Sequence, residues 1–388
     1  MSITEPVFDD LIMPLVAFRH DLHAHPELGF EEHRTAARIA AALRDIEGMD
    51  VFTGIGGTGL VAVLKAGSSD RSIGLRADMD ALPIQEETGL SYASCTPGIF
   101  HGCGHDGHVA MLLGAAQHLA RTKRFDGTVY FIFQPAEEGQ GGARAMIEAG
   151  LFDRFPADEV YALHNWPDLP AGTAATRPGP IMAAADRFEI VLEGKGGHAA
   201  IPHHTPDAIL AASDLVGQLN TIVSRRIAPT DLAVLSITQI HGGHAHNVLP
   251  PCVSVSGTVR SFDPVVQDGI EAALRQVAEG VALASGTKAK VTYDRSYPAT
   301  INDPDAAEKA LAAAACVCGH AHVAPAPALT SEDFAFMLHA RKGAYSWLGQ
   351  GQEGKGAPLH HPRYDFNDDV LATGMNWHVA LAEQLLSA

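Results

Sequence analysis

Residues 101–108 concentrate metal-binding side chains in one short polar stretch. Cys103, His105, Asp106 and His108 are separated by glycines, and the absence of a Cβ lets the backbone turn these side chains toward one point. Thiolate, imidazole and carboxylate groups are ligands of zinc and related transition metals. An apolar run with helical spacing follows at once. We therefore expect the cluster to lie where a loop enters a helix, with coordination positions left open.

Two adjacent carboxylates, Glu137 and Glu138, follow an apolar run at 128–133. Neighbouring carboxylates on a loop can point in different directions, so that one binds a metal ion while the other acts as a general base toward water. The alternative is a pair of solvated acids that open a helix, where negative charge is favourable. The apolar strand before the pair and the glycines after it favour a functional role.

Further histidines occupy loops of the same character. His164 follows an apolar run, although a hydrogen-bonded histidine without a metal is also common at such a position. His360 and His361 precede a proline, and either could be a ligand. His198 lies among small residues that permit close approach of another surface. Taken with the thiolate and the two glutamates, these histidines predict a hydrolytic metal site.

The elements that must position these residues alternate between strands and helices. Short apolar runs bounded by turn residues predict strands at 60–64, 72–76, 128–133 and 159–163, and helical patterns cover 107–121 and 141–151. This alternation is typical of a largely parallel sheet flanked by helices. Ligands of such sheets bind at the carboxyl ends of the strands, where Asp78, Glu137 and His164 are expected.

A second domain is expected within the first. Residues 173–180, rich in Ala, Gly, Pro and Thr, are interpreted as a linker. The pattern that follows is β-α-β-β-α-β, which is ferredoxin-like: strands at 187–192, 233–240, 252–260 and 289–293, and helices at 206–225 and 264–284. We expect a discontinuous larger domain at 1–180 and 294–388, with a domain inserted at 181–293. A helix at 303–319 and loops carrying 331–334 and 360–366 complete the larger domain.

Two glycine-rich segments imitate nucleotide-binding motifs. Residues 54–59 match G-x-G-x-x-G, but the apolar run after Gly59 is short and strand-like, whereas a dinucleotide site requires a helix there. A glycine-rich hairpin is the better interpretation. Residues 194–198 lack the Lys-Ser/Thr ending of a phosphate-binding loop, so ATP binding is not expected.

Composition excludes several classes of partner. The formal net charge of −18 disfavours nucleic acid and anionic membrane surfaces, which attract basic proteins. No apolar run is long enough for a membrane span, and the acidic start of the chain lacks a signal-peptide pattern. Five scattered cysteines in a chain of 388 residues fit reduced thiols. We therefore expect a cytoplasmic protein.

The sequence resembles the aminoacylase-like two-metal peptidases. Within them it is most similar to the amidohydrolase branch that contains hippurate hydrolases and plant auxin-conjugate hydrolases. The runs that carry the likeness occur in order along nearly the whole chain: 19–32, 75–83, 101–108, 134–138, 196–199, 247–250, 331–334 and 359–362. The resemblance implies an α/β fold, with a zinc-peptidase-like larger domain and an inserted ferredoxin-like dimerisation domain.

The resemblance also implies roles for individual residues. The metal ligands would be Cys103, His105, Glu138, His164 and His360. Glu137 would be the general base, and Asp78 an acid that orients a ligand or the base. The family pattern Leu-His-x-Pro selects His360 over His361. Asp106 and His108 would brace the loop. The site would hold two divalent ions, and members of the branch are found with zinc, manganese, nickel or cobalt.

Residues of the inserted domain would contact the substrate, an N-acyl amino acid. His198 would reach the active site of a second copy in a homodimer and polarise the scissile carbonyl. Asn247 and Arg260 would hold the carboxylate of the substrate. The products would be a carboxylic acid and a free amino acid. A metallo-dipeptidase or carboxypeptidase of the same family is the alternative substrate class.

Two other classes of protein are considered. A cysteine hydrolase could use Cys103 as its nucleophile with a nearby histidine. Chelation followed by metal add-back would separate it from a metalloenzyme, since only the metalloenzyme loses and regains activity. A non-catalytic metal-binding or dinucleotide-binding protein is the second rival. The presence of both Glu137 and Glu138 argues against it.

Overall fold

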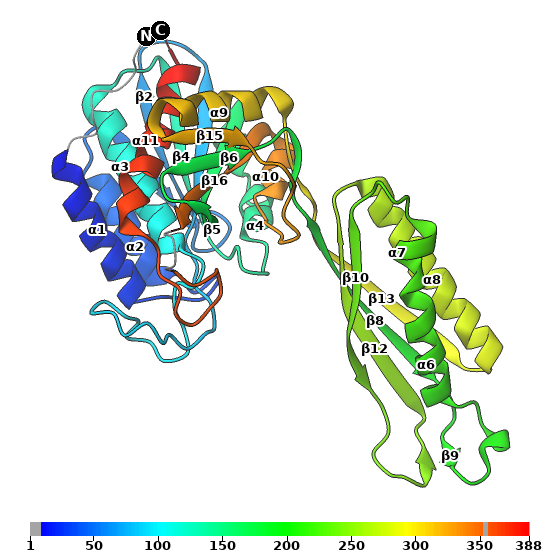
Figure 1. Ribbon diagram of the computed structural model, residues 1–388. Coiled ribbons are helices and arrows are strands. Elements are labelled where there is room, and N and C mark those ends of the chain that lie inside the picture. The colour runs from blue at the N-terminus through cyan, green and yellow to red at the C-terminus, as the bar shows by residue number, and fades with distance from the viewer. Residues whose placement is uncertain (1–8, 352–355, 388) are drawn as a thin grey trace. The chain divides into compact units, whose positions relative to one another are not determined.

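The structure is a computed structural model that describes residues 9–351 and 356–387 (Figure 1). The chain forms two compact units. The larger unit takes in the described residues up to Ile181, residues 301–326 and those from Asp333 onward, while the smaller unit comprises residues 182–300 and 327–332. Two of the crossings between the units fall in short strands, β7 (Gly179–Met182) and β14 (Thr300–Asn302), and the other two lie at residues 326–327 and 332–333.

The larger unit is built on an eight-stranded mixed sheet. In spatial order its strands are β1 (Met49–Thr53), β2 (Leu60–Ala66), β4 (Gly127–Gln134), β3 (Ser72–Asp78), β5 (Glu159–Pro170), β16 (Lys342–Gly351), β6 (Thr173–Thr176) and β15 (His320–Val323). The four central strands, β4, β3, β5 and β16, are parallel to one another. Antiparallel pairs occur toward the margins, so the expected parallel arrangement holds for the centre of the sheet.

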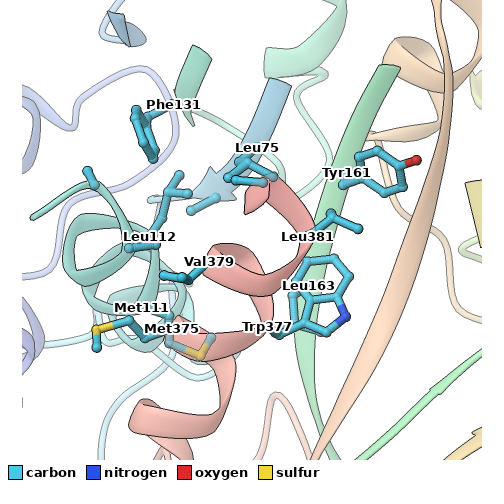
Figure 2. Close-up of a cluster of buried hydrophobic side chains, with 14 of the residues drawn as sticks. Leu75, Met111, Leu112, Phe131, Tyr161, Leu163, Met375, Trp377, Val379 and Leu381 are labelled. Carbon is cyan, nitrogen blue, oxygen red and sulfur yellow. The ribbon is translucent and has the colours of Figure 1, made fainter. Parts of the chain in front are cut away.

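Helices supply the apolar surface that buries this sheet. The long ones are α1 (Asp9–Ala24), α2 (His33–Arg44), α3 (His105–Thr122), α9 (Pro304–Val317) and α11 (Leu371–Leu385). Figure 2 shows Leu112 of α3 and Leu381 of α11 beside Leu75, Phe131 and Tyr161 of the strands, and all five belong to one buried cluster. Shorter helices are α4 (Gly142–Glu148), α5 (Leu151–Arg154) and α10 (Ala335–Ala340).

The smaller unit has the expected ferredoxin-like order. Its antiparallel sheet runs β10 (Ala233–His241), β12 (Cys252–Ser261), β8 (Ala184–Glu193) and β13 (Lys288–Tyr297). Three helices, α6 (Ala208–Leu219), α7 (Thr221–Arg226) and α8 (Pro264–Ser285), complete its own apolar core. The helix predicted at 206–225 is divided at Asn220, which ends α6 and precedes α7. A short ladder joins β9 (Gly197–His198) to β11 (Val248–Leu249).

Some elements differ from the sequence-based expectation. The linker predicted at 173–180 is wrong, because β6 pairs with β15 and β16 inside the large sheet and is buried along its length. Its small Ala and Thr side chains are buried on both faces, so no polar alternation marks the strand. Strand β16 and helix α11 occupy a region expected to form loops. The glycine-rich hairpin at 54–59 is confirmed, since it joins the antiparallel strands β1 and β2.

No helix within the described residues has both the length and the apolar character needed to cross a membrane.

Candidate metal centre

Cys103 lies in the loop that opens α3, and a glycine fixes the path of that loop. Gly104 has a left-handed backbone with φ +87° and precedes the first helical residue, His105. A Cβ at Gly104 would approach the hydroxyl of Tyr364 to 2.5 Å and Oδ1 of Asn165 to 2.6 Å. Only glycine fits this position without displacing its neighbours. The loop thus turns Cys103 inward, where its Sγ lies 3.5 Å from Nε2 of His164.

One group of ligand atoms comprises Cys103, Glu138 and His360, whose donor atoms lie within 4.8 Å of one another. Nε2 of His360 is 3.1 Å from Oε1 of Glu138. The backbone N–H of His360 donates to the carbonyl oxygen of Gly102 (2.8 Å), which ties this loop to the cysteine loop. His361 is engaged elsewhere, because its Nδ1 accepts the backbone N–H of Arg363.

The neighbouring histidines present ring nitrogens to the same space. Nδ1 of His164 lies 2.7 Å from the backbone oxygen of Asn165. A carbonyl can only accept, so Nδ1 carries the proton and Nε2 keeps its lone pair toward Cys103. Nδ1 of His105 is 3.1 Å from Asp80, and its Nε2 is buried without a hydrogen bond among the described residues.

Asp80 is a site residue that the sequence analysis did not single out. One of its oxygens contacts Nδ1 of His105, and the other accepts the backbone N–H of Glu138 at 2.9 Å. Asp80 is almost fully buried, so it fixes both a candidate ligand and the turn that carries another. Its signal was present in the sequence, since Asp80 follows the end of β3 by two residues, as other site residues follow their strands.

Asp78 belongs to a buried network beneath the ligands. It lies 2.5 Å from Nδ1 of His108 and accepts a hydrogen bond from Nη1 of Arg76 at 2.7 Å. Burial would raise the pKa of Asp78, but Arg76 and the nearby histidines, His105 and His108, hold that pKa well below its usual range. Asp78 is therefore an anion that orients His108, which in turn contacts Asn165. This is the bracing role expected of His108.

Glu137 is held separately from Glu138. Its Oε1 accepts the backbone N–H of Asp333 at 3.3 Å. The buried Asp333 carboxylate is itself fixed by Arg76 (3.2 Å), Gln134 (2.7 Å) and the backbone N–H of Ala143 (2.9 Å). A single cation, Arg76, thus restrains both Asp78 and the residue that holds Glu137. Such restraint suits a carboxylate that must accept a proton in one fixed geometry.

The electrostatic character of the site favours bound cations. Burial raises the pKa of the Cys103 thiol, and the carboxylates of Glu138 and Glu137 raise it further. Burial lowers the pKa of His105, yet Asp78 and Asp80 outweigh that effect and raise it to about 10. The carboxylates around Cys103 and His105 carry more negative charge than the nearby cationic side chains offset. This excess stabilises an added cation, either a proton or a metal ion. The donor set therefore fits divalent metal ions, as does Nε2 of His105, which makes no hydrogen bond within the described part of the chain and lies 3.7 Å from Asp78. The cluster can bind two such ions.

The structure brings two of the three candidates in the smaller unit together. Asn247 precedes β11 and His198 ends β9, and the backbone N–H of Ala199 donates to the Asn247 oxygen at 3.0 Å. Both side chains are exposed. Arg260 pairs with Ala185 at the far end of β12 from Cys252, about 25 Å along the strand at ~3.3 Å per residue. In one copy of the chain, Arg260 is therefore remote from the other two.

Comparisons with known proteins agree with this geometry. The model of peptidase family M20/M25/M40 matches residues 74–384. Hippurate hydrolase of Campylobacter jejuni is 39% identical, with 98% of this chain and 99% of the relative covered. N-acetylcysteine deacetylase of Bacillus subtilis is 40% identical over 95% and 96%. The crystal structure of a dinuclear metal-binding peptidase from Bacillus subtilis superimposes with a TM-score of 0.85 at 35% identity, covering 98% and 99%.

Fold and site together define a metal-dependent hydrolase that acts on amide bonds. The chain belongs to peptidase family M20/M25/M40. The resemblance to the hippurate hydrolase branch, on which the sequence analysis relied, is confirmed.

Proposed function

We propose that this enzyme hydrolyses the amide bond of N-acyl amino acids to a carboxylic acid and a free amino acid. The observation that carries the proposal is Glu137, a carboxylate held by its own hydrogen bond beside the candidate ligands His105 and Glu138. The hydrolase and deacetylase relatives, whose names describe N-acyl amino acids, support this substrate class.

Two groups of side chains would hold the two ions. Cys103, Glu138 and His360 would bind one ion, and His105 and His164, whose rings lie edge to face, would bind the other. Bound divalent ions lower the pKa of water toward neutrality and polarise a carbonyl group. Asp80 orients His105 and the backbone of Glu138, so the ligands are arranged before any ion arrives.

Glu137 would act as the general base and then as the general acid. It would take a proton from the water that attacks the amide carbon and deliver that proton to the leaving nitrogen. The backbone N–H of Asp333 donates to Oε1 of Glu137 and so helps to fix the orientation of this carboxylate. Asp78 acts at a distance from the reacting atoms by orienting His108 and pairing with Arg76.

His198, Asn247 and Arg260 are the proposed substrate contacts from the inserted domain. Nδ1 of His198 accepts the backbone N–H of Ala200 at 3.1 Å, so the neutral ring carries its proton on Nε2. That N–H could stabilise the oxyanion that develops on the scissile carbonyl. The hydrogen bonds of the half-buried Arg260 go to neutral oxygens, which suits a guanidinium that receives the carboxylate of the substrate.

The quaternary arrangement is part of the proposal. We propose residues 1–180 and 294–388 as the catalytic domain and 181–293 as a dimerisation domain, with His198 serving the site of a second copy in a cytoplasmic homodimer. Arg260 lies at one end of strand β12, whereas His198 lies in the separate β9–β11 ladder, next in the chain to the other end of that strand. Two copies related by a two-fold axis could bring such separated residues to one substrate.

Peptide hydrolysis is a second candidate, because the similar dinuclear protein of known structure is described as a peptidase. A cysteine nucleophile is disfavoured on physical grounds. Burial beside Glu138 and Glu137 raises the pKa of Cys103, whereas a nucleophilic cysteine needs a lowered one. Both alternatives predict different substrates or a different response to chelators.

The test is an assay of purified protein with N-acetyl, N-benzoyl and dipeptide substrates, alongside metal analysis. Glu137→Gln keeps the shape of the side chain but removes the base. It should lower kcat by about 10²–10⁴-fold with metal content unchanged. Glu148→Gln, the same change at an exposed position of α4, serves as the matched control. Near-normal turnover by the Glu137 variant would refute the mechanism, and activity on dipeptides alone would favour the peptidase.

A further inference from the structure

Arg19 is a buried cation on α1 that the proposed chemistry does not use. Its side chain is fully shielded from solvent. Three carboxylates surround the guanidinium: Asp365 at 2.9 Å, Asp368 at 3.0 Å and Asp106 at 3.4 Å. We refer to these four residues as the Arg19 cluster. Burying an arginine and several carboxylates costs desolvation free energy. Such a cluster therefore suggests a role in holding its partners in place.

The carboxylates of the Arg19 cluster flank candidate metal ligands from two distant parts of the chain. Asp106 directly follows His105 at the start of α3. Asp365 and Asp368 lie shortly after His360 in the sequence. Helix α1 supplies none of the proposed ligands, yet its guanidinium bridges the segments that carry two of them. Arg19 thus forms a charged link between the His105 segment and the His360 segment.

Neighbouring side chains orient the carboxylates of the Arg19 cluster. His23, one turn along α1, lies 2.8 Å from Asp106 through Nδ1. Burial would raise the pKa of Asp106, but Arg19 and His23 lower it well below its usual range. Tyr92 donates a hydrogen bond to Asp365 at 2.7 Å and lies under the guanidinium, with 4.7 Å from the guanidinium carbon to the ring centroid. Each member is therefore fixed by more than one partner.

The side chain of His360 is less restrained than the segment that carries it, which other hydrogen bonds anchor at Pro362 and Tyr364. The side chain of His360 is about half exposed, at 51%, and its backbone is left-handed with φ +64°, a conformation that costs energy for a residue other than glycine. Among the described residues, its tie to the cysteine loop is the hydrogen bond to Gly102. Additional anchoring of this segment would reduce the free energy needed to order His360 for binding an ion.

We propose that Arg19 is a positioning residue for the metal centre. It holds the His105 and His360 segments together, and the affinity for the ion bound by Cys103, Glu138 and His360 depends on that link. The inference uses the ligand set of the proposed function but is independent of the substrate. It also gives a physical reason for the polar motif at 19–32, which supplies no ligand.

The test measures metal binding without turnover. Arg19→Lys keeps one positive charge but loses the planar fork that reaches several carboxylates at once. The variant should bind the Zn²⁺ ion of the Cys103, Glu138 and His360 group about 10–100-fold less tightly than the wild-type protein does. Competition with a chromophoric chelator after metal removal measures this affinity. Arg38→Lys is the matched control, because Arg38 of α2 pairs with Asp21 of α1, the helix that carries Arg19, on an exposed surface. It should bind zinc as the wild-type protein does.

Two further measurements separate positioning from simple stabilisation. The melting temperature of the metal-free variants reports any general loss of stability. An Arg19→Lys protein that is less stable but binds both ions with wild-type affinity would overturn the proposal. If that variant does not fold, Asp368→Asn removes one partner of Arg19 from a partly exposed position, and an unchanged zinc affinity there would overturn it equally. A wild-type protein that binds no zinc would refute the ligand set itself.

Discussion

The two groups of candidate site residues differ in how far the folded chain already fixes them. In the larger unit, Cys103, His105 and His164 are buried, and both histidine rings are oriented by protein oxygens. In the smaller unit, His198 and Asn247 are exposed at the end of a short ladder. Metal-binding residues are thus arranged by the fold, whereas the proposed substrate contacts await a partner.

This difference follows from what each group must do. Divalent ions bind tightly where ligands are oriented and shielded from water, and their binding displaces the protons that those ligands carry. The excess negative charge around His105 is tolerated because buried cations such as Arg76 and Arg19 offset it. A residue that stabilises a transition state must instead allow substrate to enter and product to leave, so it is better placed where it can move.

The largest expected effect comes from Cys103, which is grouped with Glu138 and His360 and also contacts His164. Cys103→Ser replaces a thiolate by a hydroxyl that stays protonated and binds transition metals poorly. We expect a loss of metal affinity greater than about a hundredfold and an equal loss of activity, measured by metal analysis and by assay at saturating zinc. Cys95→Ser, at an exposed cysteine of the same unit, is the control. Retention of both ions by the Cys103 variant would show that the ligand set is wrong.

The next effect concerns His198 and tests the exposed group. His198→Ala should lower kcat by about 10²-fold, as expected for an oxyanion donor, with metal content and melting temperature unchanged because the side chain is exposed. A matched change at His241, also exposed in the smaller unit, should leave kcat within about twofold. Metal loss on replacing His198 would contradict the separation between the two groups.

Mixing two inactive variants distinguishes action within one copy from action between copies. In a mixed dimer of His198→Ala and Glu137→Gln chains, one site would have both residues intact only if His198 serves the other copy. Random exchange of subunits should then restore about a quarter of wild-type activity. No recovery after verified subunit exchange would mean that each chain uses its own His198.

The sequence revealed the chemistry of the site more fully than the fold around it. The candidate ligands have distinctive side chains at the ends of elements: Glu138 follows strand β4, and Cys103 and His105 lie where a loop enters α3. Arg76 and Asp333 carry no such signal, because a buried ion network depends on contacts between residues far apart in the chain. Asp80 was missed because Asp78, two residues earlier, offered the same carboxylate.

The fold was least predictable where strands are buried on both faces. Strand β6 contains only Ala and Thr, and β16 contains glycines whose added Cβ atoms would collide with neighbouring backbone. At Gly343, for instance, the backbone oxygen of Val160 would lie 1.9 Å from a Cβ. Positions packed this closely carry glycine or other small residues, and such residues are also typical of loops. The alternating strands of the smaller unit, with one face toward its helices, were correspondingly easier to identify.

His360 and His361 provide the finest test, since they are adjacent and chemically identical. His360 lies 3.1 Å from Glu138, whereas His361 accepts a hydrogen bond within its own turn. His360→Ala should weaken binding of one ion by about 10–100-fold, and His361→Ala should leave zinc affinity and kcat within about twofold, as is usual for exposed surface positions. Competition titration of both metal-free variants measures the difference. Equal losses in the two variants would mean that the turn, rather than the His360 ring, supports the ion, and His360 would then join the residues that the fold leaves unfixed.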